Sequence, residues 1–293
     1  LNPNFAIAHS NLSALLRDLG KLQDAEMSAR KAIELNPNFA DAYFNLGIIL
    51  IDLGKLEDAE IYVRKAIELN PNFLDAYSNL GIILKDLGKL EDAEIYARKA
   101  IELNPNYANA HSNLGTILKD LGKLEDAELC IRKAIELNPN YANAHSNLGI
   151  ILKDLGKLED AEISTRKAIE LNPNFLDAYS NLGIILKDLG KLEDAEISTR
   201  KAIELNPNYA NAHSNLGTIL KDLGKLEDAE ISTRKAIELN PNYANAHSNL
   251  GTILKDLGKS KDAELCIRKA IELNPNYANA HSNLGIILKD LGK

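Results

Sequence analysis

The stretch ADAYFNLGIILIDLGKLEDAEIYVRKAIELNPNF, residues 40–73, contains the pattern that decides the fold of this chain. The apolar residues of its first half recur at steps of four, three and four, as in one stripe of a helix: Ala42, Leu46, Ile49 and Leu53. Gly54 follows as a helix terminator, a second apolar stripe begins at Leu56, and Pro71 ends it. The stretch therefore predicts two antiparallel helices joined by a very short turn.

The same pattern recurs every 34 residues, so the chain is predicted to be a single all-α solenoid over residues 1–293. Residues 1–5 are interpreted as the tail of a preceding repeat and residues 278–293 as the first helix of a ninth. The eight complete repeats are residues 6–39, 40–73, 74–107, 108–141, 142–175, 176–209, 210–243 and 244–277. Glycines inside the first helices, such as Gly47 and Gly81, indicate close approach of a neighbouring backbone.

Charge and composition exclude several classes of partner. The formal charge of −8 is spread evenly over the repeats, whereas a nucleic-acid partner requires a clustered basic face. No apolar run approaches the roughly 20 residues of a membrane span, so we expect neither nucleic acid nor membrane as a partner. Cys130 and Cys266 lie four repeats apart, too far for a disulfide in a stacked array. Free cysteines fit a reducing compartment, and a cytoplasmic location is expected.

Asparagine occupies one fixed position in every first helix, although it is a mediocre helix former. The nine residues, which we predict to bind peptide, are Asn11, Asn45, Asn79, Asn113, Asn147, Asn181, Asn215, Asn249 and Asn283. Other residues of the same helical stripe are predicted to line the binding surface with them: Asn109, Ser112, Thr116, Lys119, Asp75, Ile82 and Lys85. An amide offers one acceptor and two N–H donors, so it can pair with both main-chain groups of an extended peptide. The alternative is that these amides bond within the array, to the preceding repeat.

The repeat resembles the tetratricopeptide repeat in its length, in the triplet Asn45-Leu46-Gly47 with its preceding aromatic residue, in Ala59 and Ala66, and in Pro71. This resemblance covers the whole chain. It implies a right-handed superhelix whose first helices line a concave groove, and a protein-interaction scaffold without catalysis. Some members clamp a C-terminal carboxylate with basic groove residues, but the corresponding positions here are not basic.

The groove pattern is most similar to that of the superhelix of O-linked N-acetylglucosamine transferase. The resemblance rests on strings such as Ala-His-Ser-Asn-Leu at residues 110–114 and Asp-Ala-Tyr-Ser-Asn-Leu-Gly at residues 75–81. In that family, an asparagine ladder holds extended substrate peptides, and the nine asparagines stand at the matching positions.

No catalytic, cofactor or metal site is expected. Every candidate acid or base recurs in repeat after repeat, whereas catalysis needs a unique constellation. Six histidines share one position, but first helices on the order of 10 Å apart could not share an ion with ~2 Å bonds. These histidines are interpreted as buried substitutes for an aromatic packing residue.

The predicted function is therefore a scaffold that binds extended peptide segments of other proteins. One alternative is a substrate-presenting arm of a larger enzyme, such as a glycosyltransferase. Another is a duplicated or engineered array without an evolved ligand, because residues 108–141 and 210–243 differ at only three positions. Both ends are expected to lack a cap. The apolar Leu284, Ile287, Leu288 and Leu291 would then face water and support head-to-tail self-association.

Overall fold

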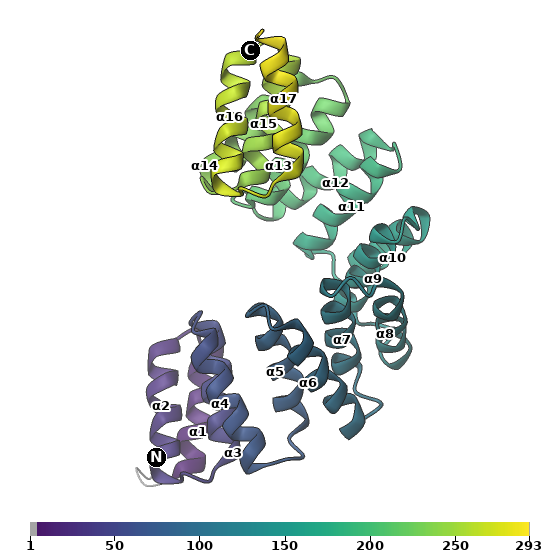
Figure 1. The fold of residues 1–293 in the computed structure, drawn as a ribbon. Helices are drawn as coiled ribbons and strands as arrows, with labels where there is room; N and C mark the ends of the chain where they lie inside the picture. Colours follow the sequence, from purple (N-terminus) through teal and green to yellow (C-terminus); the bar gives the residue numbers. More distant parts are fainter. Residues whose placement is uncertain (1–4, 293) are drawn as a thin grey trace. The chain divides into compact units, whose positions relative to one another are not determined.

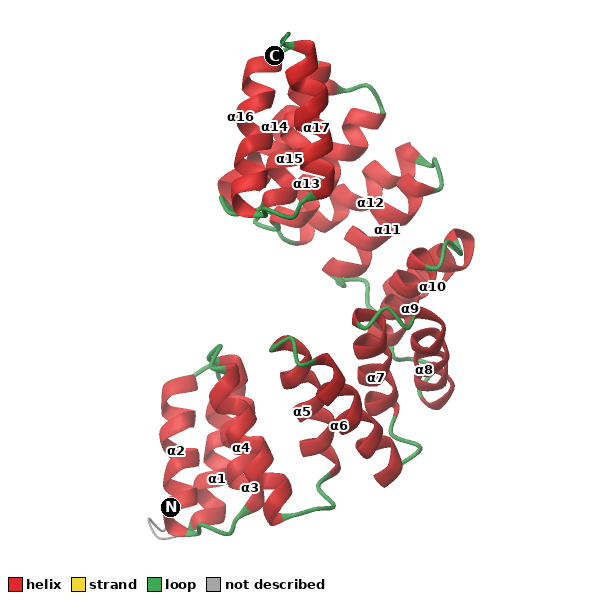
Figure 2. Ribbon diagram, in the orientation of Figure 1, coloured by secondary structure: helices red, strands yellow, loops and turns green. Residues whose placement is uncertain are grey.

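The computed structural model describes residues 5–292, and every regular element in that range is an α-helix (Figure 1, Figure 2). Helices of 13 and 14 residues alternate, one of each per repeat. The first helices are α1 (Ala6–Asp18), α3 (Ala40–Asp52), α5 (Leu74–Asp86), α7 (Ala108–Asp120), α9 (Ala142–Asp154), α11 (Leu176–Asp188), α13 (Ala210–Asp222), α15 (Ala244–Asp256) and α17 (Ala278–Asp290). The second helices are α2 (Leu22–Leu35), α4 (Leu56–Leu69), α6 (Leu90–Leu103), α8 (Leu124–Leu137), α10 (Leu158–Leu171), α12 (Leu192–Leu205), α14 (Leu226–Leu239) and α16 (Ser260–Leu273).

Each first helix ends in a glycine with a positive φ. Gly54 has φ of 73° after α3, a conformation that side chains disfavour. Its N–H donates to the carbonyl of Ile51, and the N–H of Lys55 donates to the carbonyl of Leu50. This pair of bonds is a Schellman motif, which satisfies carbonyls at the end of the helix. The predicted glycine terminator is therefore confirmed, and the chain reverses within two residues.

Each second helix ends in an asparagine-proline turn. After α4, the N–H of Asn72 donates to the side-chain oxygen of Asn70 at 3.2 Å, and the N–H of Phe73 donates to the carbonyl of Asn70 at 3.1 Å. The same turn recurs at Asn104 and Asn206. Proline prevents the helix from continuing, and the asparagine amide replaces the lost helical bonds.

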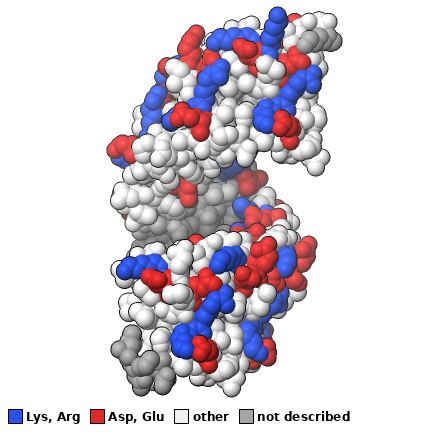
Figure 3. Space-filling model, turned by 90° about the vertical axis from the view of Figure 1, so that its left-hand side faces the viewer, with Lys and Arg blue, Asp and Glu red and all other residues white. Residues whose placement is uncertain are grey.

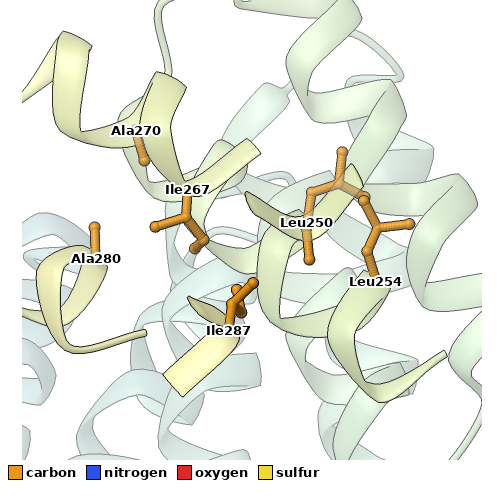
Figure 4. Close-up of a cluster of buried hydrophobic side chains, with 7 residues drawn as sticks. Leu250, Leu254, Ile267, Ala270, Ala280 and Ile287 are labelled. Carbon is orange, nitrogen blue, oxygen red and sulfur yellow. The ribbon is translucent and has the colours of Figure 1, made fainter. Parts of the chain in front are cut away.

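The core lies between successive helices, since a second helix packs against the first helix of its own repeat and of the next, as α6 does with α5 and α7. The last cluster shows this arrangement (Figure 4): Leu250 comes from α15, Ile267 from α16, and Ala280 with Ile287 from α17. Contact of each helix with its neighbours in sequence is the packing expected of an α-solenoid. The chain divides into two compact units, residues 1–144 and 145–293.

In the second to eighth repeats, the glycine inside the first helix faces the second helix of the same repeat. A Cβ on Gly115 would lie 2.6 Å from Cγ1 of Ile131 and 3.2 Å from the carbonyl oxygen of Ala127. The predicted close approach is thus confirmed, and it involves a side chain as well as the backbone. On Gly81 the same Cβ would meet only ordinary contacts, 3.5 Å from Cβ of Ala97, because alanine replaces isoleucine there.

Helix α17 is buried more than the sequence suggested. Ile287 is fully buried, and Leu284 and Leu291 pack against the cluster formed with α15 and α16. The expectation that these residues face water is wrong for Ile287, because α17 rests on the second helix before it. Ile286, which was not singled out, is instead the exposed large residue of α17.

Acidic and basic side chains are intermixed on the surface (Figure 3). In α2, α4, α6, α10, α12 and α14, one glutamate lies between an arginine four residues later and a lysine of the next repeat. Glu196 contacts Lys225 and Arg200 at 2.7 and 2.8 Å. The hydrogen bond from Lys225, supported by that from Arg200 and opposed by burial, lowers the pKa of Glu196 from its usual 4.5. The pKa of each of Glu94, Glu162 and Glu230 is also lowered, by the equivalent hydrogen bonds from a lysine and an arginine.

These glutamates should make the array sensitive to acid. A carboxyl whose pKa is lower in the folded state contributes stability above its unfolded pKa, and that stability is lost as the pH falls through the folded value. We expect the melting temperature to fall as the pH drops below 4.5. Changing Glu94, Glu162, Glu196 and Glu230 to glutamine should lower stability at neutral pH, by about 0.5–1 kcal/mol per residue. The variant should also lose less stability on acidification than the parent. Thermal melts at about pH 7 and about pH 3.5 measure both effects, and an equal loss in both proteins would contradict the assignment.

Candidate functional site

Four of the nine asparagines at the fixed position donate to a serine of the preceding repeat. Nδ2 of Asn113 lies 2.9 Å from Oγ of Ser78, and Nδ2 of Asn215 lies 3.0 Å from Oγ of Ser180. The corresponding distances are 2.9 Å for Asn45 with Ser10 and 3.1 Å for Asn249 with Ser214. All four serines are buried. We call the surface that these asparagines form within each compact unit the asparagine face: Asn45 with Asn113 in the first unit, and Asn215 with Asn249 in the second.

Asn79 departs from this arrangement. Its Nδ2 donates to the carbonyl of Asp75 in its own helix, at 2.8 Å. The reason is that Phe44 occupies the position at which the other first helices carry the serine. Its ring packs against that of Phe73 in a tilted arrangement, with ring centroids 4.8 Å apart. The array is therefore not uniform, and the difference follows from one residue.

The bond to serine uses only part of each amide. A side-chain amide has two N–H donors and one carbonyl acceptor, so one N–H and the carbonyl oxygen remain. Within residues 5–292, Asn113 and Asn215 make no further side-chain hydrogen bond. Both side chains are half-buried, so water or a ligand can reach them. The serine fixes the orientation of the amide, which lowers the entropy lost when a ligand binds.

The other predicted residues of the fourth repeat differ in their exposure. Asn109 is exposed beside Asn113, whereas Ser112 is buried, so its hydroxyl does not lie on the exposed surface as expected. Ser112 occupies the helical position of Ser78, whose hydroxyl is also buried and accepts from Asn113. Thr116 is half-buried, and its hydroxyl donates to the carbonyl of Asn113 at 2.8 Å.

The charged residues of the stripe are held by local partners. Lys85 lies 2.8 Å from Asp86 and 3.9 Å from Asp120 of the next repeat, and Lys119 lies 3.0 Å from Asp120. Ile82, in the same helix as Lys85, is half-buried. The positive charges of Lys85 and Lys119 are therefore paired with the negative charges of Asp86 and Asp120.

Asp75 accepts a hydrogen bond from the hydroxyl of Tyr107 at 2.8 Å, a contact that the sequence did not reveal. The sixth repeat repeats it, since Tyr209 donates to Asp177 at 2.7 Å. Burial, followed by this bond to the carboxylate, raises the pKa of Tyr209 to about 12. The tyrosine hydroxyl is therefore a stable donor, and Asp75 ties α5 to the turn that precedes α7.

The histidines are not buried as expected. His111, His213 and His247 are half-buried, and His281 is exposed. Nε2 of His111 lies 2.8 Å from the carbonyl oxygen of Pro105, and the equivalent contact recurs at His213 with Pro207. Both the neutral and the charged ring can donate such a bond. Their role is to tie the proline turn to the following first helix.

Cys130 and Cys266 are free and half-buried. Burial is the main cause that raises the pKa of both thiols, which makes them poor nucleophiles. They share a position in the second helix with Tyr62, Tyr96 and a series of serines. Sequence analysis did not single out this position, although its variation between otherwise identical repeats was a signal.

The structure is that of a helical repeat protein. It is an all-α array of 34-residue helix pairs with an asparagine at one position of each first helix. Models of the tetratricopeptide repeat match residues 6–39, 40–73, 74–107, 108–141, 142–175, 176–209, 210–243, 244–277 and 266–293. The chain belongs to the tetratricopeptide repeat family. No curated protein matches the chain in sequence.

The solved structures that are similar to the chain include the following three. The Cut9–Hcn1 hetero-tetramer of APC/C has 18% identity and a TM-score of 0.74 over 91% of this chain, and the chain spans 52% of that structure's chain. A tetratricopeptide repeat protein from Parabacteroides merdae ATCC 43184 has 21% identity and a TM-score of 0.69, over 85% of this chain and 98% of the other. YrrB, described as having an unusual peptide-binding site, has 27% identity and a TM-score of 0.47, over 64% and 96%. The first two support the fold of helix pairs.

Within residues 5–292, no helix is long and apolar enough to cross a membrane.

Proposed function

We propose that this chain is a scaffold that binds extended peptide segments of other proteins along the asparagine face. The observation that carries the proposal is the anchored amide, as at Asn113 and Asn215, which keeps one N–H and its carbonyl oxygen for a ligand. These two groups match the acceptor and donor of a peptide main chain. The proposal assigns no chemistry to the chain itself, and it places the protein in the cytoplasm because Cys130 and Cys266 are free.

The spacing of the amides favours one peptide conformation. First helices of successive repeats contact each other, as α11 with α13 and α13 with α15, and packed helices lie about 8–10 Å apart. A polyproline II helix advances about 9.3 Å in three residues and returns to the same face. A β-strand returns to the same face every two residues, or about 6.6 Å, which fits less well. We therefore propose that the peptide adopts a polyproline II-like conformation. Successive asparagines would then contact peptide residues that are three positions apart.

Reading the main chain makes the site tolerant of sequence. Each bond is worth a net ~0.5–1.5 kcal/mol, and the ordering of a flexible peptide offsets much of the sum. The affinity should therefore be micromolar rather than nanomolar. The resemblance of the asparagine pattern to that of O-linked N-acetylglucosamine transferase supports the same mode of binding.

Photo-crosslinking tests which face binds the peptide. Benzoylphenylalanine placed at Asn109, which is exposed beside Asn113, should crosslink to peptides selected from a random display library against the whole chain. The matched control is the same group at Leu129, which is 67% exposed on the second helix of the same repeat. Crosslinking from position 129 and not from position 109 would place the peptide on the wrong face and refute the proposal.

A further inference from the structure

One position of the second helix controls how well the core beneath it is covered. This position carries tyrosine in the second and third repeats, cysteine in the fourth and eighth, and serine in the fifth, sixth and seventh. The exposed fraction of a leucine in the first helix, sixteen residues earlier in the chain, varies with the residue at this position. It is 0% exposed under Tyr62 and Tyr96, 2% exposed under the two cysteines, and 3–4% exposed under the serines.

The sixth repeat has an opening at this position. A pocket of about 690 Å³ lies between α10, α11 and α12, and we call it the Ser198 pocket. Its walls include Tyr179, Ile169 and Ser198, and it reaches inward to Leu182 and Leu186. In the third repeat, a pocket bounded by the equivalents of Tyr179 and Ser198 encloses about 500 Å³ and has neither inner leucine in its lining.

The third and sixth repeats are a natural matched pair. Residues 74–107 and 176–209 differ only at Tyr96 against Ser198 and at Ala97 against Thr199. In the third repeat, the ring of Tyr96 stacks on Tyr77 with centroids 6.1 Å apart. The sixth repeat keeps the equivalent aromatic wall, Tyr179, but has no ring beside it. The space is therefore what remains when a phenol ring is removed from an otherwise unchanged repeat.

The arginine that recognises that ring is also present. Arg64 of the second repeat lies over the ring of Tyr96 at 5.0 Å, and its Nη1 donates to the tyrosine hydroxyl at 2.5 Å. Nε of Arg64 is meanwhile held by Glu60 at 3.0 Å. In the fifth repeat, Arg166 lines the Ser198 pocket and its Nε is held by Glu162 at 2.9 Å.

We infer that the Ser198 pocket binds a phenol ring, which stacks on Tyr179 and receives a hydrogen bond from Arg166. Tyr62 supports the recognition, since Arg30 lies 5.5 Å from its ring and donates to its hydroxyl at 2.9 Å. A ring in this place would lie against Leu182 and Leu186 at the inner end of the pocket. The site is independent of the asparagine face, because Asn181 lies two residues beyond Tyr179, about 200° round the helix.

The pocket of the seventh repeat is the internal control. Its lining is equivalent, but it encloses about 390 Å³ and carries His213 where the sixth repeat has Tyr179. It lacks the tyrosine wall on which the ring would stack. We expect p-cresol, the side-chain analogue of tyrosine, to bind the sixth repeat in preference to the seventh.

Calorimetric titration of the whole chain with p-cresol tests the inference through its stoichiometry. The parent should bind one equivalent. The double variant Ser198→Tyr with Thr199→Ala, which recreates the sequence of the third repeat and should fold as that repeat does, should bind none. Tyr96→Ser should raise the count to two. Thr199→Ala and Ser232→Tyr should leave it at one.

Arg166→Gln should weaken p-cresol binding by about two- to fivefold, the value of an exposed cation–π contact, while toluene binding changes less. A pentapeptide with a central tyrosine distinguishes the source of the ring: binding of this peptide indicates a partner's side chain, and binding of p-cresol alone indicates a free phenol. Unchanged binding in the double variant, or loss of binding in Ser232→Tyr, would overturn the inference. Neither result would affect the asparagine face.

Discussion

Replacing Asn215 and Asn249 with alanine is expected to weaken peptide binding between about fivefold and 150-fold. Two contacts at ~0.5–1.5 kcal/mol each sum to about 1–3 kcal/mol, and every 1.4 kcal/mol is a factor of ten. Fluorescence anisotropy with a peptide selected from a display library measures the change. Circular dichroism should show nearly unchanged helicity.

The control for this variant removes the same contacts from the other side. Ser180→Ala with Ser214→Ala deletes the acceptors of Asn215 and Asn249 but keeps both amides. It should lower stability by about 1 kcal/mol per bond, as the asparagine variant does. It should weaken peptide binding far less, because only the orientation of the amides is affected. Equal loss of binding in both variants would mean that the amides act only in packing the repeats together.

Gly217→Ala should destabilise the array by about 1–3 kcal/mol, the usual cost of overfilling a packed core. Its new Cβ would overlap Oγ1 of Thr233 and lie 3.2 Å from the carbonyl oxygen of Ala229. Thr233 could move only by giving up its 2.8 Å bond to that carbonyl. Chemical denaturation, followed by circular dichroism, measures the shift.

Gly81→Ala should instead be neutral or stabilising by up to about 1 kcal/mol, because alanine is the better helix former. Its Cβ would lie 3.5 Å from Cβ of Ala97, an ordinary contact. Adding Thr233→Ala to Gly217→Ala recreates this pair and should recover most of the lost stability. If both glycine variants changed stability equally, the side chain of the second helix would not be the cause.

The fold could be predicted from the sequence because local signals agree with each other. The apolar stripes, the glycine after each first helix and the proline after each second helix are short-range features. The structure confirms them at Gly54, with its positive φ, and at the turn before Pro71. Helix ends were thus fixed by the residues themselves rather than by distant contacts.

The site was harder to predict because one helical stripe meets two environments. Ser112 and Asn113 are adjacent in sequence, but the serine is buried while the amide is half-exposed. A helical wheel gives the direction of a side chain, not which neighbouring helix covers it. The role of His111 was missed for a related reason, since its partner is a carbonyl whose position depends on the turn at Pro105.

The position of Ser198 was missed although the sequence carried the signal. The third and sixth repeats are identical except at two adjacent residues, so the loss of a tyrosine ring could have been seen directly. What the sequence could not show is that Arg166 of the preceding repeat would lie at the same pocket. That contact depends on how consecutive second helices are placed.

An amide-to-ester scan of a bound peptide tests the central claim most directly. An ester removes one main-chain N–H and weakens one carbonyl acceptor without changing any side chain. If the asparagine face reads the main chain, affinity should fall about 2- to 13-fold at every third position, as expected for ~0.5–1.5 kcal/mol per bond. Alanine substitutions of the peptide's side chains should have smaller effects. Affinity that is insensitive to every ester and falls only with side-chain changes would contradict the account.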